Sequence, residues 1–486
     1  MSDRRSPRAA IAAAVLATVL GGCAVRQPAP PVPDVPAGPA LRAGDHALLA
    51  RWWTAFGDPA LVRIVDEALA RNLDVAAAFA HVELARSQVQ LAQSNLSPNA
   101  NLALGAGRSR ISGVGSPPLP AGTPLASGNF SVGVDLAYEI DLWGKYRSAT
   151  LAARNELAAS RYFAESVRAA IAAEVAVAWF RLRAADRELA LLGQTLRTRE
   201  ETVALQQDRF DAGIVGQYDL RQAQAERSDV VAGLARTRQA IGLLEGAIAT
   251  LAGRGPRELV TPLLARQDGA GAATGLPELP DGVPSGLLER RPDVRQAEAL
   301  LAAAELRIEQ ARADYYPSIS LTAAFGSESA ALADLFTSPA SVWRFGAALL
   351  QPLIGLKGIE ANVKSAEARR EEALVAYRRT VQQAFREVHD ALVVHRTARE
   401  ILDAETRRRG ELADALEVAK LRYEAGRTSF LEVLDAQRQL LGADTARIAA
   451  ARDRQIALVA FAKALGGGWD PQALGDASGD VSPATR

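Results

Sequence analysis

One short motif occurs twice in this chain of 486 residues, and that repetition limits the folds the chain can adopt. The sequence Arg-Phe-Asp-Ala-Gly at 209–213 returns as Arg-Tyr-Glu-Ala-Gly at 422–426, an offset of 213 residues. Each copy lies midway along a helical tract of roughly a hundred residues. The glycine that ends each copy can adopt the left-handed conformation that closes a helix. The motif therefore predicts two long helical hairpins, with bends at about 209–218 and 422–431.

The rest of the chain is duplicated as well. An Asp-Val pair at 74–75 recurs at 293–294, and Pro98 recurs as Pro317, both at an offset of 219 residues. A segment rich in glycine and proline lies between the two copies. We therefore expect two repeats with these boundaries: a first repeat at 51–268, a linker at 269–284, a second repeat at 285–468 and a disordered polar tail at 469–486.

The first long tract carries a coiled-coil seam. Its apolar positions are spaced alternately by four and three residues, the heptad spacing of helices that pack side by side. They are Ile171, Val175, Ala178, Leu182, Ala185, Leu189, Leu192 and Leu196. Some sixty residues of helix would extend roughly 100 Å, at 1.5 Å per residue. Such a hairpin is no compact globule, and its apolar face needs partners.

Two segments in each repeat change to a period of two. In the clearest, apolar residues alternate with polar or small residues from Phe130 to Asp141, the pattern of a strand with one apolar face. The predicted strands lie at about 100–111, 129–141, 318–326 and 342–351. A sheet packed on a soluble core is one interpretation. Because the opposite face carries charges, a membrane barrel with a wet lumen fits as well.

Four strands cannot form a lipid-facing sheet alone, because hydrocarbon does not tolerate unpaired strand edges. The smallest membrane barrels have eight strands, so several copies of the chain would have to contribute. Two copies would give eight strands around a filled lumen, and three would give twelve around an open one.

The N-terminus resembles the signal peptide of a bacterial lipoprotein. Basic residues precede a short apolar stretch, and the signal at 1–22 ends in Leu-Gly-Gly directly before Cys23. The resemblance implies cleavage after Gly22 and a diacylglycerol and an N-acyl chain on Cys23. Ala24, rather than Asp, follows the cysteine, which by the sorting rule for such lipoproteins implies the outer membrane. The remainder of 23–50 is rich in proline and alanine and predicts an extended tether.

Composition excludes several functions. The chain has 56 basic and 56 acidic residues, so no electrostatic footprint indicates a nucleic-acid partner. Cys23 is the only cysteine, which rules out an intrachain disulfide and a thiolate metal site. Among four histidines, His389 and His395 are six residues apart and do not share a helix face as zinc ligands at i, i+4 would. With no phosphate-binding loop and no nucleophile elbow, we expect no enzyme, no metal and no cofactor besides the lipid.

Several segments together resemble TolC-like outer membrane factors. They are Trp-Trp-Thr-Ala-Phe-Gly-Asp-Pro at 52–59, Glu-Ile-Asp-Leu-Trp-Gly-Lys at 139–145, Glu-Arg-Arg-Pro-Asp-Val at 289–294, Tyr-Pro at 316–317 and Leu-Asp-Ala-Gln-Arg at 434–438. The closest resemblance is to the lipoprotein branch, of NodT type, that serves resistance-nodulation-division efflux pumps.

This resemblance implies a mainly α fold with a small β part. Three copies would form a twelve-stranded transmembrane β-barrel in the bacterial outer membrane, continued by an α-barrel tunnel into the periplasm. The implied function is the exit duct of a tripartite pump, conducting drugs and toxic compounds passively. A periplasmic adaptor protein and an inner-membrane resistance-nodulation-division pump would be its partners.

The resemblance also implies where such a duct is gated and docked. Leu431 and Asp435 would project inward and form rings under threefold symmetry, with Tyr423 and Arg438 as partners that latch the periplasmic gate closed. The bends would be the adaptor-docking surface, with these residues: Gly213, Val215 and Gly216 in the first, and Gly426, Thr428 and Ser429 in the second. From the residues alone, a solvated helix residue is the favoured interpretation of Asp435, and turn chemistry does not separate a docking surface from an ordinary helical turn.

Two other functions stay open at this stage. A protein-secretion duct of type I would have the same fold and serve a different machine. A periplasmic coiled-coil lipoprotein would have no channel, although the alternating strand at 129–141 argues against it. The sequence does not identify the substrate, because drugs, solvents, metal ions and siderophores all fit.

Overall fold

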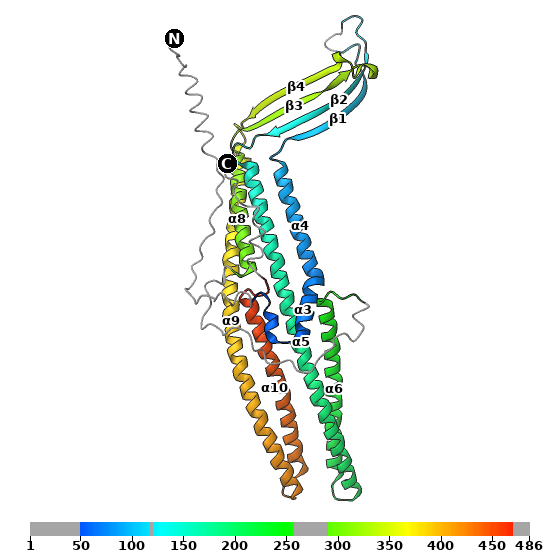
Figure 1. Cartoon of the computed structure of the whole chain (residues 1–486), viewed down its shortest axis with the longest axis vertical. Helices are drawn as coiled ribbons and strands as arrows, with labels where there is room; N and C mark the ends of the chain where they lie inside the picture. Colours follow the sequence, from blue (N-terminus) through cyan, green and yellow to red (C-terminus); the bar gives the residue numbers. More distant parts are fainter. Residues whose placement is uncertain (1–48, 116–119, 257–289, 470–486) are drawn as a thin grey trace, which may run out of the picture. The chain divides into compact units, whose positions relative to one another are not determined.

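The computed structural model describes residues 49–115, 120–256 and 290–469 (Figure 1). The signal peptide, Cys23, nearly all of the tether, the linker at 269–284 and residues 470–486 lie outside these ranges. The described chain forms two compact units. A strand-containing unit comprises 82–115, 120–160 and 297–377, and a helical unit comprises 49–81, 161–256, 290–296 and 378–469.

The elements follow one another twice in the same order, as the duplicated sequence predicts. The first series is η1 (Trp52–Phe56), α3 (Pro59–Arg71), α4 (Leu73–Ser94), β1 (Asn99–Arg110), β2 (Ala126–Glu139), α5 (Lys145–Asp211) and α6 (Gln217–Leu251). The second is α8 (Pro292–Ala313), β3 (Ser318–Ser329), η2 (Leu332–Asp334), η3 (Ser338–Ala340), β4 (Ser341–Leu350), α9 (Leu356–Glu424) and α10 (Phe430–Ala464). The arms α6 and α10 are both 35 residues long, and α5 and α9 have 67 and 69. The fold is mainly α with a small β part, as expected.

The strand-containing unit holds one antiparallel sheet in the order β1-β2-β3-β4. The register pairs Leu102 with Val134, Val134 with Phe325, and Phe325 with Trp343. Directly opposed residues share a face, so these four side chains form one row across the sheet. Strands β1 and β4 are its edges, and neither has a second neighbour in the sheet.

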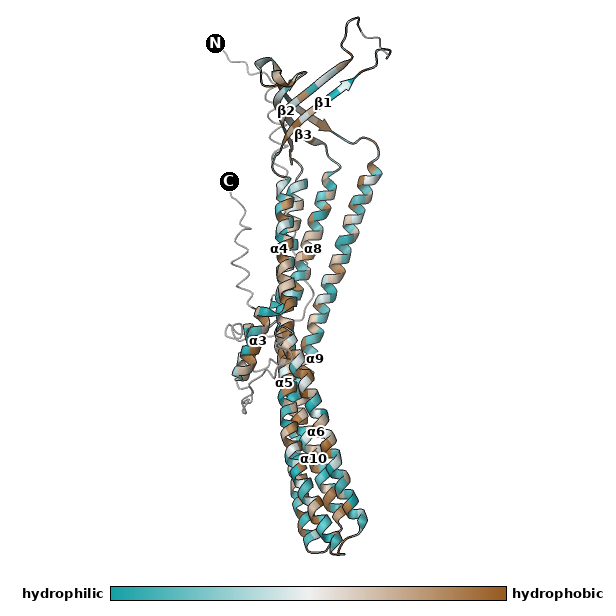
Figure 2. Cartoon of the chain, turned by 90° about the vertical axis from the view of Figure 1, so that its right-hand side faces the viewer, coloured by the Kyte–Doolittle hydropathy of each residue, from teal (hydrophilic) through white to brown (hydrophobic). Residues whose placement is uncertain are grey.

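The pairing register segregates the large apolar residues of the sheet by face, as the period of two predicts. Figure 2 shows hydrophobic and hydrophilic residues interspersed along the strands. The face that carries Leu102 and Trp343 also carries these large residues: Leu104, Val132, Leu136, Tyr138, Leu321 and Phe345. The other face carries Asp135, Glu139, Glu328 and Arg344. Several side chains of the apolar face are largely exposed in the single chain, including Leu104 at 75% and Trp343 at 71%.

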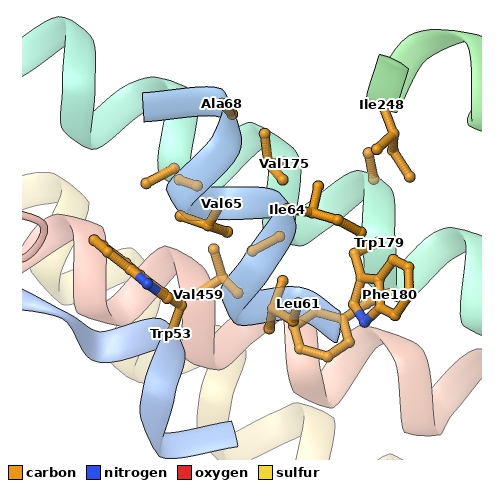
Figure 3. Close-up of a cluster of buried hydrophobic side chains, with 14 of the residues drawn as sticks. Trp53, Leu61, Ile64, Val65, Ala68, Val175, Trp179, Phe180, Ile248 and Val459 are labelled. Carbon is orange, nitrogen blue, oxygen red and sulfur yellow. The ribbon is translucent and has the colours of Figure 1, made fainter. Parts of the chain in front are cut away.

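The helical unit has a core where η1 and α3 pack on α5, α6 and α10 (Figure 3). Helix α3 begins at Pro59 because Asp58 caps it, accepting from the backbone N–H groups of Ala60 at 2.9 Å and Leu61 at 3.3 Å. The second carboxylate oxygen of Asp58 accepts from the indole N–H of Trp179 on α5 at 2.8 Å. This buried carboxylate therefore ties the cap of one helix to the side of another.

The seam of α5 is largely buried, in agreement with its heptad spacing. Val175 and Leu182 have no exposed surface, and Ile171 and Leu192 are less than a tenth exposed. Leu192 packs with Val230 and Leu234 of α6, so the two arms of the first hairpin share an apolar interface. Within the described ranges, no helix combines the length and apolarity that a membrane-spanning helix requires.

The end of the described chain corrects one expectation. Trp469 was assigned to the disordered tail, but it is 5% exposed and its indole N–H donates to the carbonyl of Arg290 at 2.8 Å. The glycines just before it make this possible, since a Cβ on Gly467 would lie 3.0 Å from the carbonyl oxygen of Leu49. Sequence polarity after Trp469 concealed this anchor.

Candidate functional site

Both hairpin bends are built alike. Gly213 has a φ of 72° and Gly426 a φ of 67°, so each adopts the left-handed conformation that its place in the motif predicts. In the first bend, the N–H of Ile214 donates to the carbonyl of Arg209 at 2.8 Å. In the second, the N–H of Arg427 donates to the carbonyl of Arg422 at the same distance. This pattern is a Schellman cap, which satisfies the last carbonyls of a helix before the chain turns.

The other predicted docking residues lie between the arms. Gly216 and Ser429 are extended residues that precede α6 and α10, and neither caps its helix with a side chain. Val215 and Thr428 are half-buried. The Thr428 hydroxyl donates to Glu432, which also accepts from Arg422 at 3.0 Å, so the second bend carries a polar brace.

Tyr423 joins the two hairpins. Its hydroxyl oxygen accepts from a guanidinium nitrogen of Arg209 at 2.5 Å, and the same guanidinium lies 5.4 Å from the centroid of the Tyr423 ring. The ring packs on Phe430, with 5.7 Å between ring centroids. Arg209 and Tyr423 belong to the two copies of the repeated motif, so the copies contact each other directly.

Arg438 also joins the two hairpins. Its Nε donates at 2.7 Å to Oε1 of Glu226 on α6, and a second guanidinium nitrogen donates to the same oxygen. The other oxygen of Glu226 lies 3.7 Å from Arg199 on α5, which in turn bonds to Gln437. One buried carboxylate therefore holds two arginines from different hairpins.

The charges of this cluster affect one another. Burial lowers the pKa of Arg199, an effect that Glu226 opposes and Arg438 reinforces. The hydrogen bond that Arg438 donates to Glu226 raises the pKa of Arg438. Both arginines stay charged at neutral pH, because a guanidinium group loses its proton only in strongly basic solution. The cluster is thus a carboxylate between two cations, which holds α10 against α5 and α6.

Leu431 and Asp435 lie on the first turns of α10 and make no side-chain hydrogen bond with this cluster of described residues, although the Asp435 charge contributes to the raised pKa of Arg438. Leu431 is 45% exposed, and the Asp435 carboxylate is exposed and accepts only from Gln439, at 2.6 Å, among the contacts in the described ranges. Their neighbours Phe430 and Leu434 are buried against Ala223 of α6. The structure therefore separates the four predicted gate residues into two inter-hairpin contacts and two exposed side chains.

Sequence reasoning missed the partners. Glu226, Arg199 and Gln206 did not stand out in the sequence, and each is nearly fully buried in the structure. Gln206 is a second donor to the Tyr423 hydroxyl, at 3.5 Å. Arg209 was visible as the first residue of the repeated motif, but its contact with Tyr423 spans 214 residues. An acidic residue on the apolar stripe of α6, between Ala223 and Val230, was the one local signal for Glu226.

Comparisons with known proteins agree with this architecture. Residues 64–254 and 283–467 match the family described as outer membrane efflux protein. Outer membrane protein OprJ of Pseudomonas aeruginosa is 35% identical over 483 residues, covering 96% of this chain and 97% of OprJ. The antibiotic efflux pump outer membrane protein ArpC of Pseudomonas putida is 31% identical over 482 residues, covering 97% of this chain and 98% of ArpC.

Solved structures give the same result. The crystal structure of the CmeC outer membrane channel of Campylobacter jejuni matches with a TM-score of 0.84 at 26% identity, covering 94% of this chain and 99% of that one. Both halves of the chain match the family, and the two relatives match over nearly their whole length. The chain therefore belongs to the outer membrane efflux protein family and is an outer membrane component of an efflux system.

Proposed function

We propose that three copies of this chain close into one exit duct, through which small molecules leave the cell passively. The observation that carries the proposal is the open sheet. It has one apolar face and two unpaired edges, β1 and β4. In a membrane, β4 of one copy would pair with β1 of the next, which leaves no free edge after three copies. Twelve strands would enclose an open lumen lined by the polar face.

The helical hairpins support the same assembly. At 1.5 Å per residue, α5 and α9 are each about 100 Å long. Apolar side chains on α9 and α4 stay exposed in the single chain, including Ile401 at 53% and Leu91 at 69%. Helices of this length with exposed apolar positions need neighbours, which further copies of the chain would supply.

The periplasmic gate is proposed to lie at the start of α10. Leu431 and Asp435 would each form a ring of three in the trimer, and three facing carboxylates repel one another. Tyr423 and Arg438 would oppose that repulsion, since each fastens the second hairpin to the first. Asp435→Ala should therefore raise the conductance of the isolated channel. An unchanged conductance would return Asp435 to the role of a solvated helix residue.

The bends are proposed to dock a periplasmic adaptor protein, which connects the duct to an inner-membrane pump of the resistance-nodulation-division class. The exposed residues of both bends support this, and the second bend differs by the Arg422–Glu432–Thr428 brace. A photo-crosslinking residue placed at Val215 or Ser429 should capture the adaptor in living cells. A crosslinker at exposed Val231, on the side of α6, is the matched control and should capture none.

Cys23 is proposed to carry the covalent diacylglycerol and N-acyl lipid that anchor the chain in outer membrane lipid. It lies outside the described residues, so its support is the sequence that precedes it. Mass measurement of the N-terminal peptide from purified protein tests the assignment. Cys23→Ser should remove the lipid mass, whereas an unmodified wild-type peptide would refute it.

The substrates are proposed to be drugs and other toxic compounds, in line with the name of ArpC, an antibiotic efflux pump outer membrane protein. The experiment that tests the function measures intracellular accumulation of a fluorescent drug in cells lacking this gene. Accumulation should rise on deletion and return to normal with the wild-type gene. Deletion without any rise, for each of a panel of drugs, would contradict an efflux role for this chain toward drugs.

A further inference from the structure

The apolar face of the sheet carries two charges, and both lie at one end. The register assigns Arg108 and Arg110 of β1 to the same face as Leu102 and Leu104. All four strands belong to the described residues, and no other Asp, Glu, Lys or Arg lies on this face of them. The remaining charges of the strands, Asp135, Glu139, Glu328 and Arg344, occupy the opposite face.

The two arginines are open to the surroundings. Both side chains are exposed, and no carboxylate among the described residues pairs with either. Their cross-strand neighbours on β2 are small, because Arg108 pairs with Gly128 and Arg110 with Ala126. Exposed guanidinium groups above a row of apolar residues are placed to bind an anion from outside the chain.

The position of the pair matches a membrane boundary. The apolar face runs along β2 from Phe130 to Tyr138 and continues to Ile140, which follows the strand and donates to the carbonyl of Ile319. Ten residues of extended chain span about 33 Å. With the usual tilt of about 45°, this gives a band of about 23 Å, close to the 25 Å of outer-membrane proteins. Arg108 and Arg110 follow Ala106, the partner of Phe130, and so begin where the band ends.

The direction of β1 indicates which boundary this is. The start of β1 follows α4 and the end of β2 precedes α5, so Arg110 lies at the strand ends that lead away from both helices. With the helices in the periplasm, these ends lie in the outer leaflet. That leaflet is built from glycolipids whose headgroups carry phosphates, and a guanidinium binds phosphate with two parallel hydrogen bonds.

We propose that Arg108 and Arg110 form a lipid-facing binding site for the phosphate groups of the glycolipid in the outer leaflet, the lipid A portion of lipopolysaccharide. This inference rests on the proposed function, because it requires the sheet to face lipid. The site fixes the depth of the sheet in the membrane, since the acyl chains pack on the apolar rows while the phosphates bind at Arg108 and Arg110. Three copies of the chain provide three such sites.

The test is lipid binding to the purified full-length chain, counted by native mass spectrometry. The probes are bisphosphorylated lipid A and the same lipid with its phosphates removed, with inorganic phosphate as a competitor. The variants are the double variant Arg108→Gln, Arg110→Gln, the single variant Arg110→Gln, and Arg344→Gln as the control on the opposite face. Mass in detergent and single-channel conductance are measured for every variant.

For the wild type, we expect an affinity for bisphosphorylated lipid A about tenfold or more above that for the dephosphorylated lipid. The double variant should lose this preference, the single variant should lose part of it, and Arg344→Gln should keep it. Inorganic phosphate at millimolar concentration should not displace the lipid. If the double variant fails to assemble, the lipid preference of Arg110→Gln alone tests the site. Arg110 is the last residue of β1, so this single change should disturb the sheet least.

Three results overturn the inference. The first is a preference for bisphosphorylated lipid A that is as strong in the arginine variants as in the wild type. The second is equal affinity of the wild type for the two lipids. The third is displacement of the lipid by inorganic phosphate, which would indicate a free-phosphate site. The measurements of mass and conductance distinguish a failure of this lipid site from a failure of the proposed duct. A conducting wild type without phosphate preference refutes this site alone, whereas a monomeric, non-conducting wild type refutes the duct and this site together.

Discussion

Arg438 on α10 donates to Glu226 on α6 at 2.7 Å, across a sequence separation of 212 residues. Glu226 is 8% exposed and also faces Arg199, which is 3% exposed. The carboxylate therefore lies between two cations from different hairpins. Removing its charge affects the buried Arg199 more than the half-exposed Arg438, because water can solvate the latter.

Glu226→Gln should destabilise the helical unit by about 3 kcal/mol, because it leaves the buried guanidinium of Arg199 without an anion. It should also raise the open probability of the channel, since the second hairpin loses an anchor. Thermal unfolding and single-channel recording measure the two effects. The control is Glu200→Gln. Its partner Arg227 is half-exposed and lies 3.5 Å away, so this variant should cost less than about 1 kcal/mol. Equal effects of both variants would contradict the assignment.

Tyr423→Phe should cost about 1 kcal/mol, the usual contribution of one hydrogen bond, because it removes the hydroxyl that accepts from Arg209 and keeps the ring. Tyr423→Ala should cost about 3 kcal/mol or more, since the ring also packs on Phe430. Unfolding of the purified chain measures both. Tyr218→Phe, at a side chain 65% exposed, is the control and should be neutral. Identical losses for Phe and Ala at 423 would show that the hydroxyl alone matters.

Gly253→Ala should destabilise the helical unit by at least about 2 kcal/mol. Gly253 has a φ of 67°, and a Cβ there would lie 2.2 Å from the carbonyl oxygen of Arg71, a backbone atom that cannot rotate away. Gly242→Ala, inside α6, where a Cβ would have nothing within 4 Å, should instead stabilise by up to about 1 kcal/mol. The two variants should change the free energy of unfolding in opposite directions. A neutral Gly253→Ala would contradict the close approach of Gly253 to the backbone of Arg71.

The stability of the helical unit should fall in mild acid because of His395. Burial lowers the pKa of His395 from its ordinary 6.5, and Arg454 and Arg399 lower it further. Below pH 6.5 the unfolded chain takes up a proton that the folded chain resists, so stability is lost as the pH falls from 6.5 toward the folded pKa. His395→Gln should flatten this part of the stability profile. A variant with the same slope as the wild type would contradict this role of His395.

The regular elements were predictable because their signals are local. Strands expected at about 100–111 and 129–141 lie at 99–110 and 126–139. The bends follow from glycine chemistry, and Gly213 and Gly426 adopt the expected conformation. A period of two or a heptad seam needs only a dozen neighbouring residues to be recognised.

The contacts between hairpins were not predictable in the same way. Arg438 was proposed as a latch, but its partner Glu226 is a single acidic residue whose burial depends on how α10 packs on α6. Trp469 looked like the start of a polar tail, yet it is anchored by the carbonyl of Arg290, 179 residues earlier. Such pairs are set by the packing of distant elements, and no spacing along one segment encodes them.

The most direct test of the exit duct is the single-channel conductance of the full-length chain in a planar lipid bilayer, recorded on a preparation of known mass in detergent. We predict a species with the mass of three chains that conducts in discrete steps, because three open sheets are needed to close one barrel. A monomeric species that inserts no conducting channel would contradict the account.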